Sequence, residues 1–436
     1  MEEERIMDSA DDAGPRLIEK NESRGSFDIK EMVSKELPPL PANSCIYRVP
    51  KRLRRVNEEA YTPQMVSIGP LHHGKENFLA MEEVKLRYLN KLLDRTNMIL
   101  DDCIEEIKKL EADARDCYAE NIKLTSDEFV KMMLVDGSFI IEAMLILTGT
   151  YASEDTKNHT YFKRWTVVDM RPDMILLENQ LPFFILQTIF NLAFPAGKCW
   201  NHSLLEISLS FFGDIMMAEK CPKTTLTLEV KHFLDLLRLC HLPSSLRPSP
   251  YEFDKFYVSI PKAVELCEAG VVFMKGSLER LLDIHYTPGV LKIPPLVIQQ
   301  RSEILLRNLM ALEQCHYQYD SYITDYIYLM DNLIDTDKDV ELLVQNGIIM
   351  TFYGDNSRLA NLFNNLVIET TLATDNYYYY GCAKEIKEFC EVPWHKWKAT
   401  LKRDYLSTPW KVSSTIAAIV LILLTFIQTI CSIIGK

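Results

Sequence analysis

The chain is poor in glycine and has no excess of positive charge. Only 15 of its 436 residues are glycine, and its formal net charge at pH 7 is −13. Glycine at about half its usual share favours helices over barrels or glycine-rich phosphate-binding loops. Because nucleic-acid binding needs a basic face for the phosphates, the acidic balance argues against a nucleic-acid partner.

Paired cysteines and known catalytic motifs are also missing. The 11 cysteines include no C-x-x-C pair, so we expect buried thiols in a reducing compartment, with neither a disulfide framework nor a zinc site. No G-x-x-x-x-G-K-[ST], G-x-G-x-x-G, H-E-x-x-H or G-x-S-x-G motif occurs. The opening MEEERIMDSADDAG lacks the apolar core of a secretory signal. The sequence therefore predicts no catalytic residue, no cofactor and no metal site.

Two polar patterns resemble metal sites but have the wrong spacing. His72 and His73 are adjacent in the chain, so their side chains should point apart. The aspartates that begin at Asp335 open like a calcium-binding loop, but Val340 and Asn346 stand where that loop needs glycine and glutamate. An acidic helix N-terminus explains these aspartates better.

A long apolar run lies near the end of the sequence. Residues 416–434 read IAAIVLILLTFIQTICSII, 19 residues without a charge or a proline. About 20 apolar residues span a bilayer, so we predict a transmembrane anchor over residues 412–436. A buried core helix is the alternative, but such helices usually show a polar face. The residues assigned to the anchor are Trp410, Ile416, Val420, Leu424, Ile427 and Ile434.

A basic segment precedes the anchor. Within residues 394–411, Asp404 opposes five basic side chains: Lys396, Lys398, Lys402, Arg403 and Lys411. Aromatic and basic residues before an apolar span predict an amphipathic juxtamembrane helix on anionic headgroups. The positive-inside tendency then predicts a cytosolic head, with the C-terminus across a plasma membrane or endomembrane. The alternative is that Trp394 and Trp397 pack inside the head.

The remainder is predicted to be a mainly α, multi-helix head. Residues 1–42 are acidic and lack apolar periodicity, which predicts a disordered arm before a head over residues 43–393. Helical periodicity marks the following stretches: 81–93, 98–117, a buried helix pair over 129–149 that includes Gly137, two pieces split at Pro182, 226–239, a short piece ending at Gly270, 303–343, 359–372 and 378–405. Partial alternation predicts one small antiparallel β-sheet near 271–298.

Two groups of polar residues in the head call for an interpretation. Glu178, Asn179 and Gln180 stand together just before Pro182. They are a candidate structural polar cluster that caps helix ends left open by the proline, and a functional site between the helices is the alternative. The five basic residues between Arg48 and Arg55 predict a solvated or partner-facing turn, with a nuclear-import patch as the alternative.

Several long blocks of the sequence resemble the plant family of domain of unknown function 247, the UPF0481-type plant membrane proteins. The resemblance runs from about Cys45 to the C-terminus. One departure is visible, since the family often has an acidic pair where this chain reads Gln299-Gln300, and Ser302 replaces a common threonine. The blocks, in the family's order, are IYRVPKRLRRVNEEAYTPQMVSIGPLHHG, MMLVDGSFIIE with MILLENQLPFFIL, IPPLVIQQRSEILLRNLMALEQC with YLMDNLIDTDKDVELLVQNGII, and YLSTPWKVSSTIAAIVLILLTFIQTICSII.

The resemblance implies a mostly helical protein with a C-terminal membrane span and no catalytic residues to carry over. Some family members are associated with loci that control gametophytic self-incompatibility in grasses. We therefore expect a membrane-anchored interaction or signalling scaffold that contacts the bilayer and a protein partner. The alternatives are a self-recognition determinant acting between cells and a membrane-bound enzyme with a dispersed active site.

Overall fold

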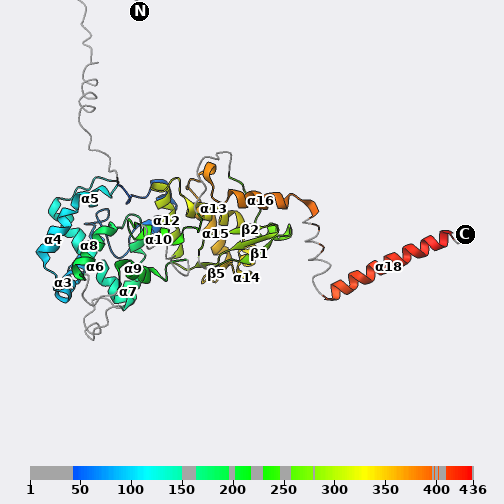
Figure 1. Ribbon diagram of the computed structural model, residues 1–436, viewed down its shortest axis with the longest axis horizontal. Coiled ribbons are helices and arrows are strands. Elements are labelled where there is room, and N and C mark those ends of the chain that lie inside the picture. Colours follow the sequence, from blue (N-terminus) through cyan, green and yellow to red (C-terminus); the bar gives the residue numbers. More distant parts are fainter. Residues whose placement is uncertain are drawn as a thin grey trace, which may run out of the picture. The chain divides into compact units, whose positions relative to one another are not determined.

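The computed structural model describes residues 43–149, 164–195, 202–217, 229–245, 257–277, 280–394, 397, 401 and 409–434. The acidic arm predicted over residues 1–42 lies outside them. Within this range the protein is mainly helical, as predicted (Figure 1).

The first group of helices is organised around α6 (Ser126–Thr148), a single buried helix. Its N-terminus carries a capping box between Thr125 and Glu128, and Gly149 ends it in the left-handed conformation, with φ of 66°. α6 packs against several neighbours (Figure 1): α3 (Leu79–Thr96), α4 (Leu100–Lys109), α5 (Glu111–Asp116), α7 (Arg164–Met170), α8 (Phe183–Ala193) and α9 (Leu204–Phe212).

The prediction of a helix pair over 129–149 is wrong, because α6 is continuous through Gly137. A Cβ atom at this position would lie 2.4 Å from Cδ1 of Ile189 on α8. Gly137 therefore marks a close helix–helix contact rather than a break. The charged Asp136 and Glu142 on α6 are buried, and Lys85 and Arg95 of α3 neutralise them across distances of 2.7 and 2.6 Å.

The apolar stretch before Pro182 also differs from the prediction. A helix does follow the proline, as α8, but residues before it form the short 3-10 helix η4 (Asp173–Ile175) and then an extended segment. The backbone of this segment is bonded by side chains instead of a helical ladder. For example, the Leu177 N–H donates to Asn308 Oδ1 at 2.9 Å.

A second group of helices is organised around α12 (Ser302–Cys315). It packs on α10 (Phe233–His241), α13 (Tyr322–Leu333), α15 (Asn356–Leu366) and the short helix η1 (Glu59–Tyr61). The other elements of this half are α2 (Lys51–Val56), α11 (Ala263–Glu268), α14 (Asp337–Gln345), η6 (Thr374–Asn376) and α16 (Tyr380–Cys390), whereas η2 (Glu76–Phe78) packs on α3 of the first group. The aspartates near residue 337 form the start of α14, where Asp339 completes a capping box with Thr336.

The predicted antiparallel sheet near 271–298 is instead mixed. β3 (Val290–Ile293) pairs in parallel with β1 (Val272–Lys275) and antiparallel with β2 (His285–Thr287). β4 (Leu296–Ile298) leaves this sheet and pairs in parallel with β5 (Ile349–Thr351). β1 to β4 therefore lie where strands were predicted, but β5 lies outside that range, and two of the three pairings are parallel.

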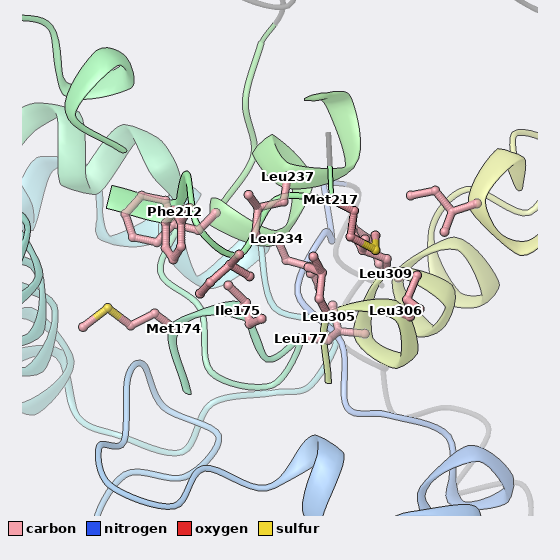
Figure 2. Close-up of a cluster of buried hydrophobic side chains, with 14 of the residues drawn as sticks. Met174, Ile175, Leu177, Phe212, Met217, Leu234, Leu237, Leu305, Leu306 and Leu309 are labelled. Carbon is pink, nitrogen blue, oxygen red and sulfur yellow. The ribbon is translucent and has the colours of Figure 1, made fainter. Parts of the chain in front are cut away.

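One hydrophobic core joins the two groups of helices. Figure 2 shows the η4 segment, the end of α9, α10 and α12 contributing side chains to a common cluster. All of these side chains are buried, which removes their apolar surface from water. The labelled members are Met174, Ile175, Leu177, Phe212, Met217, Leu234, Leu237, Leu305, Leu306 and Leu309.

The apolar run at the end of the chain forms α18 (Pro409–Ile434), a helix of 26 residues. Of the described residues, these alone make a helix long and apolar enough to cross a membrane, and none of its side chains is buried. The helix begins a few residues before residue 412, where the anchor was predicted to begin. Gly435 and Lys436 lie outside the described residues.

Candidate functional site

The apolar residues assigned to the anchor all lie exposed on α18. Trp410 near its start is 84% exposed, and Ile434 at its end is 78% exposed. The members between them are also exposed: Ile416, Val420, Leu424 and Ile427. An apolar helix without a covered face is either a membrane span or a surface that another molecule covers.

Most of the basic residues assigned to the juxtamembrane segment lie outside the described residues. Lys411 is on α18, but the structure does not describe Lys396, Lys398, Lys402 and Arg403. Trp394 and Trp397 are 64% and 70% exposed, so these tryptophans do not pack inside the head.

Glu178 is the centre of a buried polar cluster in the head. Its oxygen Oε1 accepts from the Val49 N–H at 2.6 Å and from the Arg54 guanidinium at 2.5 Å. His72 Nε2 contacts the other oxygen at 3.0 Å. Burial alone would raise the pKa of Glu178, but the bonds from His72 and Arg54 outweigh it and hold that pKa below its ordinary value. Glu178 is therefore an ionised carboxylate inside the protein.

The contacts of His72 fix its tautomer. The Lys75 ammonium, which can only donate, lies 2.7 Å from Nδ1 of His72. Nε2 must then carry the proton and donate it to Glu178. Burial lowers the pKa of His72 despite the Glu178 contact, so the ring is neutral at pH 7. The arrangement is a chain of bonds from the exposed Lys75 to the buried carboxylate.

Asn179 and Gln180 are buried beside Glu178 but bond to backbone groups. Asn179 accepts from the Ile68 N–H at 2.7 Å and donates to the Val66 carbonyl at 3.0 Å. The Gln180 amide donates to the carbonyls of Met174 and Leu176, both at 2.8 Å. The Gln180 amide group thus donates locally while its Oε1 accepts from the Leu234 N–H at 3.4 Å, and Glu178 and Asn179 hold a distant part of the chain.

Two aspartates also accept hydrogen bonds from the backbone of residues 64–69. Asp173 accepts three backbone N–H groups, from Gln64 at 2.9 Å, Met65 at 2.6 Å and Val66 at 2.9 Å. Asp136 accepts from the Gly69 N–H at 2.8 Å and pairs with the buried Lys85. These two aspartates were not predicted as site residues. The signal for Asp136 was a charge inside an otherwise apolar helical block.

Gly69 shows how closely residues 64–69 approach the segment that contains Gln180. Its φ of 70° lies in the left-handed region, and a Cβ atom there would lie 2.6 Å from the Gln180 carbonyl oxygen. Both the conformation and the contact exclude a larger side chain. We call Asp136, Asp173, Glu178, Asn179 and Gln180 the buried polar cluster.

Of the basic residues between Arg48 and Arg55, only Arg54 is half-buried and the others are exposed, as expected for a solvated turn, but three of the arginines also pair within the chain. Arg54 reaches Glu178, as described above. Arg48 pairs with Glu120 at 2.8 Å, and Arg55 pairs with Glu369 at 2.7 Å. The prediction of a solvated or partner-facing turn therefore missed that these three arginines have partners within the chain.

A second buried carboxylate performs a similar role on α12. Glu313 accepts from the N–H groups of Ile323 at 3.0 Å and Thr324 at 2.7 Å, at the start of α13. Arg238 of α10 lies 3.2 Å from the same carboxylate. Glu313 therefore supplies a cap from another helix to the open N–H groups of α13.

The described surface has open hollows. One of about 450 Å³ is lined by residues near 214–216 and 297–302, with Phe352 79% exposed beside it. An adjoining hollow of about 400 Å³ shares part of this lining, and another of about 340 Å³ lies near Tyr353. Gln299, Gln300 and Ser302 line the hollow of about 450 Å³.

Some charged residues at these hollows are paired. Arg171 and Asp214 are 3.3 Å apart in the hollow of about 450 Å³, and Glu303 and Arg307 are 2.8 Å apart in the hollow near Tyr353. Among the described residues, no group of three or more His, Cys, Asp or Glu side chains is arranged to hold a metal ion.

The sequence pattern of a plant protein family of unknown function, DUF247, matches residues 46–424 of the chain. The protein belongs to this family. The matched range includes the whole buried polar cluster and most of α18.

Two proteins of Arabidopsis thaliana are similar to this DUF247 member over nearly their full length. UPF0481 protein At3g47200 is 27% identical over 417 residues, which cover 90% of this chain and 86% of that protein. Putative UPF0481 protein At3g02645 is 21% identical over 491 residues, covering 88% and 89%. No solved structure matches the chain.

The first prediction concerns the charge of Glu178. Replacing it with glutamine leaves the Arg54 guanidinium without its buried counter-charge, so we expect the free energy of unfolding to fall by about 3 kcal/mol. Thermal unfolding of the full chain in detergent measures the change. Glu120→Gln is the matched control, because it removes the partner of Arg48 at the exposed surface and should cost less than about 1 kcal/mol. Equal losses in the two variants would contradict the central role of Glu178.

The second prediction concerns His232, the N-cap residue of α10. Its Nδ1 accepts from the Asp235 N–H and its Nε2 donates to the Cys45 carbonyl, so the buried ring is neutral. Burial lowers the pKa of His232 to about 4, below its ordinary value of 6.5. As pH falls below 6.5 the unfolded chain binds the proton first, and the folded state loses up to about 1.4 kcal/mol per pH unit until pH approaches 4.

His232→Asn should therefore flatten the pH dependence of the unfolding temperature between pH 7 and pH 5, whatever its effect on stability at pH 7. The exposed His285→Asn serves as control and should keep the slope of the unsubstituted protein. An unchanged slope in His232→Asn would show that another group binds the proton.

Proposed function

We propose that this DUF247 protein is anchored to a membrane by α18 and that its helical head binds another protein. The observation that carries the proposal is the exposure of α18. Its 26 residues exceed the length needed to cross a hydrocarbon core about 30 Å thick, and none of its side chains is buried. Exposed apolar surface of this extent is stable in lipid and unfavourable in water.

The flank of α18 supports an orientation. Trp410 and Lys411 lie at the first turn of the helix, and four further basic residues precede it in the sequence. Aromatic rings prefer the interface, and basic residues accumulate on the cytosolic side. In the proposed topology the head therefore lies in the cytosol, and Lys436 lies on the other side of the bilayer.

The chemistry of the head favours binding over catalysis. Its buried carboxylates, such as Glu178 and Glu313, accept hydrogen bonds from backbone and side-chain donors, which gives them a structural role. Some charged groups at the open hollows are paired with each other, as are Arg171 and Asp214. A catalytic site instead brings titratable groups of perturbed pKa together in a pocket that admits a substrate.

Two other functions remain as alternatives and have different requirements. A self-recognition determinant acting between cells needs its head outside the cytosol. A membrane-bound enzyme with a dispersed site needs reactive groups that converge at one of the hollows. The orientation of the head distinguishes the self-recognition determinant from the proposed function. Binding of substrate-sized ligands in the hollows distinguishes the membrane-bound enzyme from it.

The third prediction tests the anchor. The full chain should stay in the membrane pellet after extraction with alkaline carbonate, and a chain lacking residues 409–436 should be soluble, because it lacks the exposed apolar helix. Fractionation followed by immunoblotting measures both. Pelleting of the shortened chain under carbonate would contradict anchoring by α18.

Protease treatment of sealed microsomes decides the orientation in the same preparation. With tags at both ends, we expect the N-terminal tag to be cleaved and the C-terminal tag to be protected. A protected head carrying glycans at Asn158 or Asn201 would overturn the cytosolic placement and favour recognition between cells.

The fourth prediction tests whether the head binds a partner. Full-length protein in microsomes should give discrete cross-linked products that disappear when the soluble chain lacking residues 409–436 is added in excess, because both compete for one site. A reporter fused only to residues 394–436 serves as control for neighbours met through the bilayer. Products that the reporter also forms, or that resist competition, would contradict binding by the head.

A further inference from the structure

Two cysteines far apart in the sequence meet where the head begins. The N–H groups of Cys45 and Ile46 both donate to the Cys117 carbonyl at 2.9 Å, and the Ala119 N–H donates to the Ile46 carbonyl at 3.0 Å. Ile46 and Tyr118 form a parallel bridge. Paired strands lie about 5 Å apart, so the Cα atoms of Cys45 and Cys117 have a separation within the range of roughly 4.4–6.8 Å that a disulfide requires.

The two thiols also contact each other. A hydrogen bond links the side chains of Cys45 and Cys117, and this bond raises the pKa of Cys45 and lowers the pKa of Cys117. Cys45 is thus the donor, and Cys117 is the sulfur that becomes a thiolate first. Cys117 is also the more accessible of the two, at 8% exposure against 3% for Cys45.

The surrounding contacts hold the two backbones in this register. The side-chain amide of Asn43 donates to Asp116 at 2.9 Å on one side of the pair, and Arg48 pairs with Glu120 on the other. His232 holds the Cys45 carbonyl from α10. Because both chain segments are fixed on either side, a bond between the sulfurs requires little movement of the backbone.

We propose that Cys45 and Cys117 form a redox-active dithiol that closes to an intramolecular disulfide when the head meets an oxidising thiol–disulfide pool. Both cysteines are free thiols in the structure, which is the reduced state of this pair. The proposal concerns the head alone and depends neither on the membrane nor on a partner.

Oxidised glutathione is a sufficient oxidant. The Cys117 thiolate attacks one of its sulfurs, which forms a mixed disulfide and releases one glutathione thiolate. Cys45 then gives up its proton and attacks the Cys117 sulfur, which forms the Cys45–Cys117 bond and releases the second glutathione. Two protein thiols are oxidised, one glutathione disulfide is reduced to two thiols, and the two protons pass to the glutathione thiolates or to water.

The bond would join the first residues of the head to the end of α5. It would close a loop of roughly 70 residues that contains α2, α3 and α4 and the whole stretch held by the buried polar cluster. Cross-linking a loop of this size restricts the unfolded chain more than the folded one. The oxidised head is therefore the more stable form.

The experiment uses the full chain in detergent, equilibrated in buffers with a series of ratios of reduced to oxidised glutathione. After acid quenching and alkylation, peptide mapping by mass spectrometry should find a Cys45–Cys117 linked peptide that increases with the oxidised fraction. Over the same series the unfolding temperature should rise by about 5 °C, an order-of-magnitude value for a loop of this size in a chain of this length.

Three variants control the measurement. Cys45→Ser and Cys117→Ser should lose both the linked peptide and the redox dependence of the unfolding temperature. Cys103→Ser removes another buried thiol, on α4, and should keep both. The peptide map of the unsubstituted protein does not depend on whether the serine variants fold.

One result would overturn the proposal directly. If the exposed Cys267 acquires glutathione, so that the oxidant is shown to act, while Cys45 and Cys117 stay unlinked, the pair is not a redox-active dithiol. A temperature shift of equal size in Cys45→Ser would likewise assign the effect to other thiols.

Discussion

The head depends on hydrogen bonds to the backbone of residues 64–69, an irregular stretch beside α6. Residues 64–69 have no strand partner, and an unpaired N–H or carbonyl in the interior is unfavourable by several kcal/mol relative to water. Side chains of the buried polar cluster supply the missing partners, and Asp173 alone accepts three N–H groups. Arg54 balances the charge of Glu178 and Lys85 that of Asp136, while the neutral His72 donates a hydrogen bond to Glu178. The two helix groups are thereby joined by directional bonds as well as by the apolar core of Figure 2.

The same pairing of polar groups with partners from the chain occurs at three places in the structure. Glu313 closes the start of α13 from a neighbouring helix, Lys85 neutralises Asp136 inside the core, and the cap at Thr125 closes α6 locally. Buried charges of this kind add little net stability compared with apolar residues of equal volume, but removing one partner is costly. Their effect is to specify one arrangement of the helices, because an alternative packing would leave an ion without its partner.

Local patterns in the sequence predicted the helices and strands better than they predicted which of them pair or pack together. The apolar run of α18, the periodic helices and the position of the strands follow from composition and spacing. The pairing of β4 with β5 does not, because two short apolar runs carry no information on which distant run they join. A helix pair was predicted over residues 129–149, because sequence alone does not reveal the approach of Ile189 that accounts for Gly137 inside one continuous helix. Likewise, Glu178 and Asn179 were recognised as a cluster, but their partners lie more than 100 residues earlier in the chain.

This separation along the chain has a consequence for the order of folding. Helices α3 to α6 contact one another over short distances in sequence and can form as soon as they are synthesised. Residues 49–69 precede them on the chain, yet the backbone N–H groups of Val49, Val66 and Ile68 have no partners until residues 173–180 exist. The earliest part of the head to be synthesised is thus among the last to be fixed. During that interval it exposes unpaired backbone and apolar side chains to the chaperones that receive a nascent chain.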